Sequence, residues 1–180
     1  MFRQEILLSG FGGQGVVAAG KILGCAAALH GLRVTMLVSH GTETRGGYVR
    51  SQVVVSDEPI DSPVVESPDI FCAMSQAAWN RFSFLMKQGT VLYDPETVSF
   101  PPESIVEKPS RFVRLAIPAG ATAEAIGSRQ FANAVFVGAI IKELDSVPLE
   151  RAKRAIQKIV PRLTEENIQA LEAGYRYSFK

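Results

Sequence analysis

Short apolar runs alternate with segments of helical spacing along most of the chain. Apolar and β-branched runs predict strands over residues 6–9, 33–39, 48–56, 70–75, 89–94 and 111–117. Helical spacing predicts helices over residues 14–30, 75–87, 131–144 and 148–160, and from residue 164 to the C-terminus. This alternation indicates an α/β fold with a mainly parallel sheet and a helical C-terminal region.

Two loops of the first strand–helix–strand unit are expected at one edge of the sheet. Such a unit forms a parallel pair with a right-handed crossover, so we expect the strands at 6–9 and 33–39 to be adjacent. The loops that begin at Gly10 and His40 follow the carboxyl ends of these strands. Ligands of α/β sheets bind beyond the carboxyl ends of the strands, so these loops are the predicted site.

Length and charge narrow the class of protein. The 180 residues indicate a single domain, 1–180, in which 145–180 form a helical C-terminal extension. The 19 basic and 18 acidic residues give a net charge of +1, which does not indicate binding to nucleic acid or to an anionic membrane. The longest stretch without a charged side chain, 6–20, is too short to span a bilayer, and the N-terminus lacks the apolar core of a secretory signal. We therefore expect a cytoplasmic protein.

The residues that could carry catalysis or hold a metal ion are few. Cys25 and Cys72 are far apart in apolar surroundings, so we expect both to be packed side chains. No cysteine cluster suits zinc or an iron–sulfur centre, and His30 and His40 complete no ligand set. We also find no Ser-His-Asp set and no paired carboxylates. The sequence therefore predicts neither a catalytic residue nor a metal ligand in this chain.

The glycine-rich turn after the first strand is the clearest candidate for binding. Gly10, Gly12 and Gly15 fit G-x-G-x-x-G between a strand and a helix, where backbone N–H groups can approach an anion at the helix N-terminus. A dinucleotide site also requires an acidic residue at the end of the second strand, but Ser39 and His40 stand there. No P-loop pattern is present. Two interpretations stay open: the glycines only permit close packing of strand and helix, or they bind another group or a partner's surface.

A second candidate loop follows the second predicted strand. In "TETRGG", residues 42–47, Arg45 offers a planar set of donors suited to phosphate or carboxylate, and the two glycines let the backbone pass close to a ligand. The candidate binding residues of both loops are Gly10, Gly12, Gly13, Gln14, Gly15, Thr44, Arg45, Gly46 and Gly47.

Several segments together resemble one protein family. These are "GFGGQGVVAAGKIL", "SHGTETRGGYVRSQVVVSDEPIDSPVV" and "PDIFCAMSQAAWNRF", with Ser75–Gln76–Ala77 after a strand and Asn133 in a later helix. The combination resembles the gamma subunit of 2-oxoacid:ferredoxin oxidoreductases over residues 5 to about 145. Residues 39–44 read SHGTET, where many members carry Tyr-Gly-Pro-Glu before the Arg-Gly-Gly.

The resemblance implies a fold and a role. It implies a Rossmann-like domain, with helices on both faces of the sheet, that binds no redox cofactor by itself. The implied partners are alpha and beta subunits and, in some complexes, a delta subunit. Thiamine diphosphate and iron–sulfur clusters are expected on those subunits. The whole complex oxidatively decarboxylates a 2-oxoacid, with 2-oxoglutarate favoured over pyruvate, forms acyl-coenzyme A and reduces ferredoxin.

The resemblance leaves open what the two loops contact. They either bind coenzyme A at the interface with the other subunits or only dock on those subunits. Two alternatives remain: a free-standing Rossmann-type nucleotide-binding protein, and a purely structural subunit that binds no ligand. A domain that normally buries one face on a partner exposes apolar surface when isolated, so self-association of the isolated chain is a further expectation.

Overall fold

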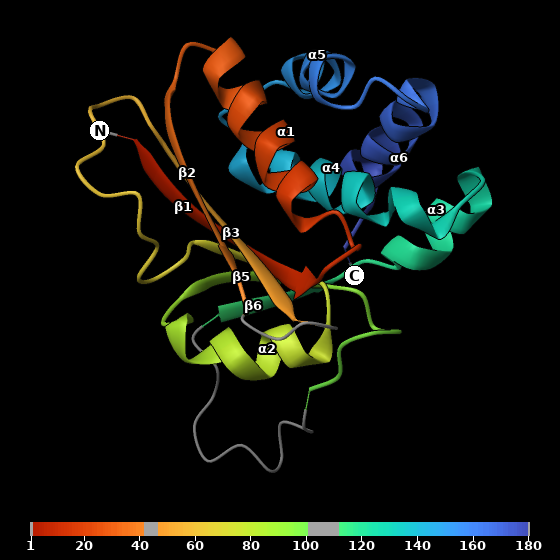
Figure 1. The fold of residues 1–180 in the computed structure, drawn as a ribbon, viewed down its shortest axis with the longest axis horizontal. Coiled ribbons are helices and arrows are strands. Elements are labelled where there is room, and N and C mark those ends of the chain that lie inside the picture. The colour runs from red at the N-terminus through yellow and green to blue at the C-terminus, as the bar shows by residue number, and fades with distance from the viewer. Residues whose placement is uncertain (1, 42–46, 101–111, 180) are drawn as a thin grey trace.

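The computed structural model describes residues 2–41, 47–100 and 112–179, and it forms one twisted sheet with helices on both faces (Figure 1). The strands are β1 (Arg3–Phe11), β2 (Arg33–His40), β3 (Tyr48–Ser56), β4 (Ile70–Ala73), β5 (Gly89–Tyr93) and β6 (Phe112–Ala116). Their order across the sheet is β2-β3-β1-β4-β5-β6. The predicted α/β class is confirmed.

The order of the strands corrects one prediction. Strands β1 and β2 run in the same direction, but they are not adjacent, because β3 lies between them and pairs antiparallel with both. The remaining neighbours, β1–β4, β4–β5 and β5–β6, are parallel. The carboxyl ends of β1 and β2 still share one edge, since Gly10 and His40 both pair with Val49 of β3. The prediction was therefore wrong about adjacency and right about the edge.

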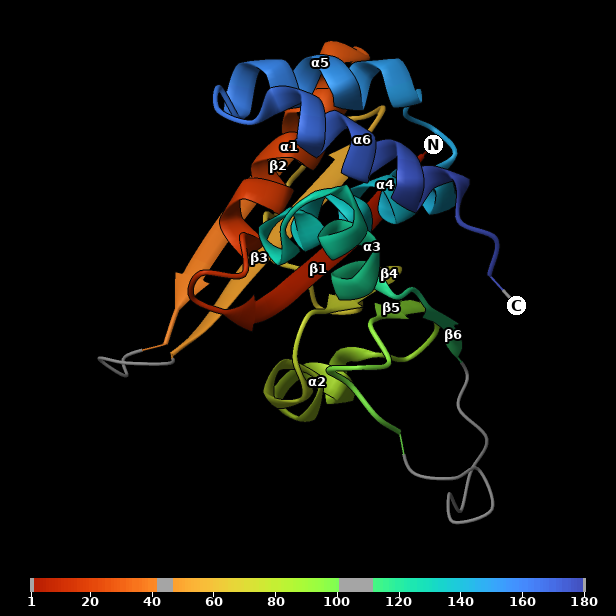
Figure 2. The ribbon, with the colours of Figure 1, turned by 90° about the vertical axis from the view of Figure 1, so that its right-hand side faces the viewer.

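The helices form two unequal layers (Figures 1 and 2). They are α1 (Val16–Leu29), α2 (Gln76–Phe82), α3 (Ala119–Ile126), α4 (Ala132–Leu144), α5 (Leu149–Ile159) and α6 (Thr164–Arg176), with 3-10 segments η1 (Ser83–Leu85) and η3 (Arg129–Phe131). Helices α1, α3, α4, α5 and α6 lie on one side of the sheet, and α2 lies on the other. No helix among the described residues is long and apolar enough to cross a membrane.

Each side of the sheet has its own hydrophobic core. The larger core joins alternate residues of β1, such as Ile6 and Leu8, to α1, α4, α5 and α6. The smaller core packs Leu7 and Phe71 against Phe82 of α2. Because neighbouring strand residues point to opposite faces, both cores are built from the same strands. Strand β1, which leads into the glycine turn, thus lies between two packed layers.

Local sequence signals account for some of the helix ends and not for others. Ser75 caps α2, because its hydroxyl accepts a hydrogen bond from the Ala78 N–H at 3.2 Å. Gly31 ends α1 with φ +92°. Thr164, a residue type common at N-caps, does not cap the last helix: Leu163 occupies that position at φ 53°, and the Thr164 hydroxyl donates to the Val160 carbonyl. Helix α3 was not predicted.

Burial makes one cysteine chemically inert. Cys72 is fully buried in β4, and this burial raises the pKa of its thiol far above the ordinary value. The reactive thiolate is therefore disfavoured near neutral pH in the folded chain. We expect a thiol reagent at pH 8 to leave Cys72 unmodified in the native chain and to modify it after denaturation, as measured by peptide mass spectrometry. Modification of Cys72 in the native chain would contradict the burial described here.

Candidate functional site

The glycine turn leaves β1 at its carboxyl end and leads into α1. Gly13 and Gly15 adopt positive φ values of 93° and 77°, which favour glycine. Between them, the Gln14 side chain makes two hydrogen bonds that hold the turn in place. Its Oε1 accepts from the Phe11 N–H at 2.7 Å, and its Nε2 donates to the Met74 carbonyl at 3.0 Å. The Gln14 amide therefore joins the end of β1 to the residue that follows β4.

The glycines of the turn are required for different reasons. A Cβ on Gly10 would overlap Gln14, and a Cβ on Gly15 would overlap Asn133 of α4. Asn133 donates its Nδ2–H to the Gly15 carbonyl at 3.4 Å. A Cβ on Gly12, by contrast, would meet nothing within 4 Å among the described residues, and Gly12 has no positive φ. The described part of the chain therefore does not explain the glycine at position 12, which leaves room there for a ligand or a partner surface.

The second predicted loop returns beside the first. The Gly12 N–H donates to the Gly47 carbonyl at 3.4 Å, and the Gly41 N–H donates to the Tyr48 carbonyl at 2.8 Å. The two loops are therefore neighbours, as the sequence predicted. Of the candidate residues in this loop, Thr44, Arg45 and Gly46 lie outside the described residues.

Two hollows flank the glycine turn. One, of about 360 Å³, is lined by Gly12, the first turn of α1 and His40. The first turn of α1, Val16–Ala18, carries no acidic side chain, so the positive end of this helix is open to an anion. The other hollow, of about 270 Å³, lies between Gly13, Met74 and Asp94, beyond the carboxyl ends of β1, β4 and β5. Ligands of α/β sheets bind at this kind of position.

Asp94 and Arg129 line the second hollow, and neither is among the binding residues predicted from the sequence. Asp94 follows β5 and is 3% exposed. Its carboxylate accepts from the Gly120 N–H at 2.7 Å and from the Glu96 N–H at 2.9 Å, and so fixes the start of α3. Arg129 pairs with Glu96 and, at 3.2 Å, with Glu124. The hydrogen bond to Glu96, together with the charge of Glu124, raises the pKa of Arg129.

The strand order weakens a dinucleotide assignment further. In a dinucleotide-binding fold, the parallel strand beside β1 carries the acidic residue that binds a ribose. Here the neighbour on that side is antiparallel β3, whose residues opposite Gly10 and Phe11 are Val49 and Tyr48. A carboxylate is thus missing both there and at the end of β2.

Several polar side chains of the site that the structure describes are engaged within the chain. Among the described residues, no group of three or more His, Cys, Asp or Glu side chains is arranged to hold a metal ion. The Gln14 amide is bonded within the chain, and the Asp94 carboxylate caps backbone N–H groups. What the described residues offer is a rim that consists of an open glycine and a helix N-terminus, since the N–H groups of Phe11, Gly12 and Gln14 are bonded within the chain. Such a rim suits binding of an anionic ligand or a partner.

Comparisons with known proteins agree with this picture. Residues 5–177 match the family described as "Pyruvate ferredoxin/flavodoxin oxidoreductase". The chain is 43% identical over 178 residues to "2-oxoglutarate synthase subunit KorC" of Methanothermobacter marburgensis, covering 96% of this chain and 95% of that protein.

Two solved structures have the same fold. The gamma subunit of a keto/oxoacid ferredoxin oxidoreductase from Geobacter sulfurreducens matches with a TM-score of 0.81 and 31% identity, covering 96% of both chains. The 2-oxoglutarate:ferredoxin oxidoreductase from Magnetococcus marinus, with 2-oxoglutarate, coenzyme A and succinyl-CoA bound, matches with a TM-score of 0.84 and 26% identity. That match covers 97% of this chain and 31% of the longer one. The chain therefore belongs to the pyruvate ferredoxin/flavodoxin oxidoreductase family.

Proposed function

We propose that this chain is the gamma subunit of a cytoplasmic 2-oxoacid:ferredoxin oxidoreductase that acts on 2-oxoglutarate. The complex converts a 2-oxoacid and coenzyme A to acyl-coenzyme A and carbon dioxide, and it passes two electrons to ferredoxin. Similarity over nearly the full length to a 2-oxoglutarate synthase subunit supports the choice of substrate. The site supports the subunit role, because it combines a binding rim with no catalytic set among the described residues.

The partners in this proposal are alpha and beta subunits, with a delta subunit in some complexes. Thiamine diphosphate and iron–sulfur clusters belong to those partners, where they supply decarboxylation and electron transfer. This chain contributes the surface that packs on the thiamine-binding subunits and faces the coenzyme A side of the site.

We place coenzyme A phosphates at the glycine turn. Gly12 admits close approach to the backbone, and the N-terminus of α1 offers unbonded N–H groups and a positive dipole. Arg45 of the second loop supplies a charged donor to the same rim. The observation that carries this assignment is Gly12, since the other glycines of the turn are explained by contacts or backbone angles within the chain.

Replacing Arg45 with alanine is expected to raise the KM of the complex for coenzyme A by about tenfold to hundredfold. The loss of one charge-assisted phosphate contact corresponds to roughly 1.5–3 kcal/mol. Steady-state kinetics with varied coenzyme A measure this. Arg33→Ala, at the opposite end of β2, is the matched control and is expected to leave this KM unchanged. If Arg45→Ala instead releases an active alpha–beta complex that lacks this chain, the loop is an interface and the ligand assignment is wrong.

The substrate assignment is tested on the complex purified through this chain. Ferredoxin reduction that requires coenzyme A is measured with 2-oxoglutarate, pyruvate, 2-oxoisovalerate and indolepyruvate. We expect the highest kcat/KM with 2-oxoglutarate. A complex that prefers another of these acids keeps the subunit assignment and overturns the substrate.

A free-standing nucleotide-binding protein is the competing function. It predicts that the isolated chain binds NAD or FAD, and equilibrium dialysis against NAD, FAD and coenzyme A measures this directly. The missing ribose carboxylate beside β1 argues against it.

A further inference from the structure

Two arginines and two aromatic rings form a stacked cluster on the α2 side of the sheet. The guanidinium of Arg81 lies 4.1 Å from the centre of the Tyr48 ring and donates to the Tyr48 hydroxyl at 3.3 Å. Tyr48 meets Phe82 edge to face at 5.5 Å, and the Arg50 guanidinium lies 5.2 Å from the Phe82 ring. We call these four residues, Tyr48, Arg50, Arg81 and Phe82, the arginine–aromatic cluster. Cation–π stacking fixes both guanidinium groups before anything binds.

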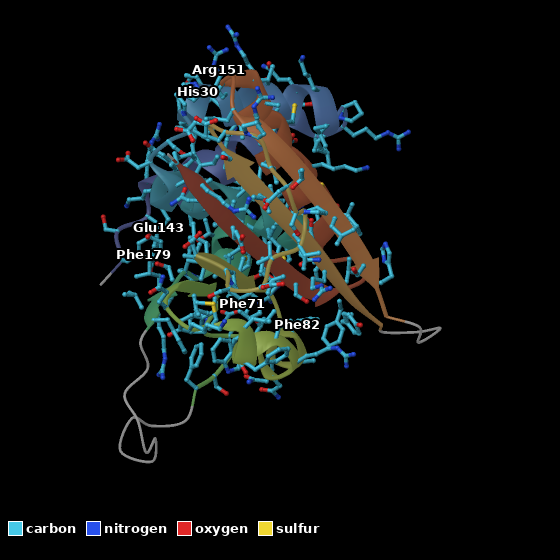
Figure 3. All side chains as sticks on the ribbon, turned by 90° about the vertical axis from the view of Figure 1, so that its left-hand side faces the viewer. His30, Phe71, Phe82, Glu143, Arg151 and Phe179 are labelled. Carbon is cyan, nitrogen blue, oxygen red and sulfur yellow. The ribbon has the colours of Figure 1, made fainter. Side chains whose placement is uncertain are left out.

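The cluster lies away from the large helical layer. Arg50 of β3 faces the same side of the sheet as Ser9 of β1 and Ser39 of β2, its partners in register. Figure 3 shows Phe82 on α2, below the sheet, and Arg151 far from it at the opposite end of the molecule. The cluster therefore belongs to a different surface from α1, α4, α5 and α6.

The positive charges of the cluster lack anionic partners in the part of the chain that the structure describes. None of the ion pairs found there involves Arg50 or Arg81. The Nε atom of Arg50 is shielded from solvent and has no hydrogen-bond acceptor. Among the described residues, Arg3, Arg129 and Arg176 are paired with carboxylates, whereas Arg114, whose Nε is also shielded and without an acceptor, is not. A shielded guanidinium N–H without an acceptor is costly, and the residues that the structure describes leave that of Arg50 unsatisfied.

A carboxylate completes this geometry. The two terminal nitrogens of a guanidinium also present N–H groups in parallel, and a carboxylate accepts both at once. Arginine, tyrosine and phenylalanine are also the side chains enriched in the buried centres of protein–protein interfaces. Tyr48 directly follows Gly47, whose carbonyl bonds to Gly12, so the cluster borders the glycine turn. A partner that covers the turn therefore also reaches the cluster.

We propose that the arginine–aromatic cluster is a docking site for an aspartate or glutamate side chain of the catalytic partner subunit that covers the glycine turn. This inference rests on the proposed subunit role. To that role it adds the surface of this chain that anchors the partner and the kind of side chain on the partner that this surface recognises. Arg50 and Arg81 bind the carboxylate, and Tyr48 and Phe82 hold them in place.

The test uses the whole complex, purified through this chain and carrying Arg50→Gln, Arg50→Lys or Arg81→Gln. The NaCl concentration that releases half of the chain from its partner subunits is measured by size exclusion and native mass spectrometry. Competition between differently tagged wild-type and variant chains, expressed together, gives their relative incorporation. Arg151→Gln on α5 is the matched loss of one positive charge. Thermal melting of each isolated chain checks that the variant folds.

We expect each cluster variant to be incorporated at least tenfold less than wild type and to be released at lower salt, with Arg151→Gln unchanged. Arg50→Lys is expected to fail like Arg50→Gln, because lysine keeps the charge but loses the parallel donors. Arg81 is exposed, so Arg81→Gln tests the site even if Arg50 variants do not fold. If the folded Arg81→Gln chain is incorporated as well as wild type, the proposal is overturned. This holds even if acetate or phosphate binds the isolated chain through these arginines. If wild type itself purifies without larger subunits, the subunit role fails, which is a different outcome.

Discussion

Replacing Gly174 with alanine is expected to lower the free energy of unfolding by about 3 kcal/mol, although alanine normally stabilises a helix by about 1 kcal/mol relative to glycine. Helices α4 and α6 cross at Gly138 and Gly174. A Cβ on Gly174 would overlap the Val135 carbonyl oxygen and lie 2.8 Å from its carbon, and a Cβ on Gly138 would overlap the Leu171 carbonyl oxygen. Both obstacles are backbone atoms of the facing helix, so no side chain can move aside. Gly138→Ala is expected to cost a similar amount.

Urea unfolding followed by circular dichroism measures this effect. The matched control is Gly24→Ala in α1, whose new Cβ would meet only the end of the Val34 side chain, at 3.3 Å. We expect this control to change stability by less than about 1 kcal/mol. If Gly174→Ala and Gly24→Ala have the same midpoint, helices α4 and α6 do not approach as closely as described.

Replacing Gly12 with valine is expected to leave stability nearly unchanged and to impair the complex by at least about tenfold, either in the KM for coenzyme A or in assembly. The described residues leave room for a side chain at this position. If a ligand or partner lies against the turn, the added atoms must displace it, and such overpacking costs about 1–3 kcal/mol. Thermal melting of the chain and steady-state kinetics of the purified complex measure the two effects separately.

Two other variants serve as comparisons for Gly12→Val. Ala28→Val adds a similar apolar group at an exposed position in the last turn of α1 and is expected to change neither quantity. Gly15→Ala is expected to destabilise the chain itself, because of its φ of +77° and the overlap with Asn133. A Gly12→Val complex with normal assembly and normal coenzyme A kinetics would mean that the turn faces only solvent, which favours a structural subunit.

The glycine turn could be predicted from the sequence because its signals are local. The spacing of Gly10, Gly12 and Gly15 between a strand and a helix depends only on neighbouring residues. The sequence could not separate their roles, however. Whether a glycine is required by Asn133, as at Gly15, or by something outside the chain, as at Gly12, depends on contacts between distant segments.

The order of the strands and part of the second hollow could not be predicted for the same reason. The apolar run of β3 fits a buried strand, but nothing local states that it lies between β1 and β2. Helix α3, "AGATAEAI", is rich in alanine, which favours a helix. The residues at its two ends, Pro118 and Gly127, are residue types that are also common in loops. Asp94, directly after a buried strand, carried the one signal that could have been used: a carboxylate at the carboxyl edge of the sheet.

The central claim is that this chain works as a subunit of an oxidoreductase complex. Mild affinity purification of the tagged chain from its native cells, with intact-mass analysis and assays for thiamine diphosphate and iron, tests it most directly. We predict two larger subunits in a fixed ratio with this chain, with bound thiamine diphosphate and iron–sulfur clusters. A chain that arrives alone, or as a homo-oligomer that carries a nucleotide, would contradict the claim.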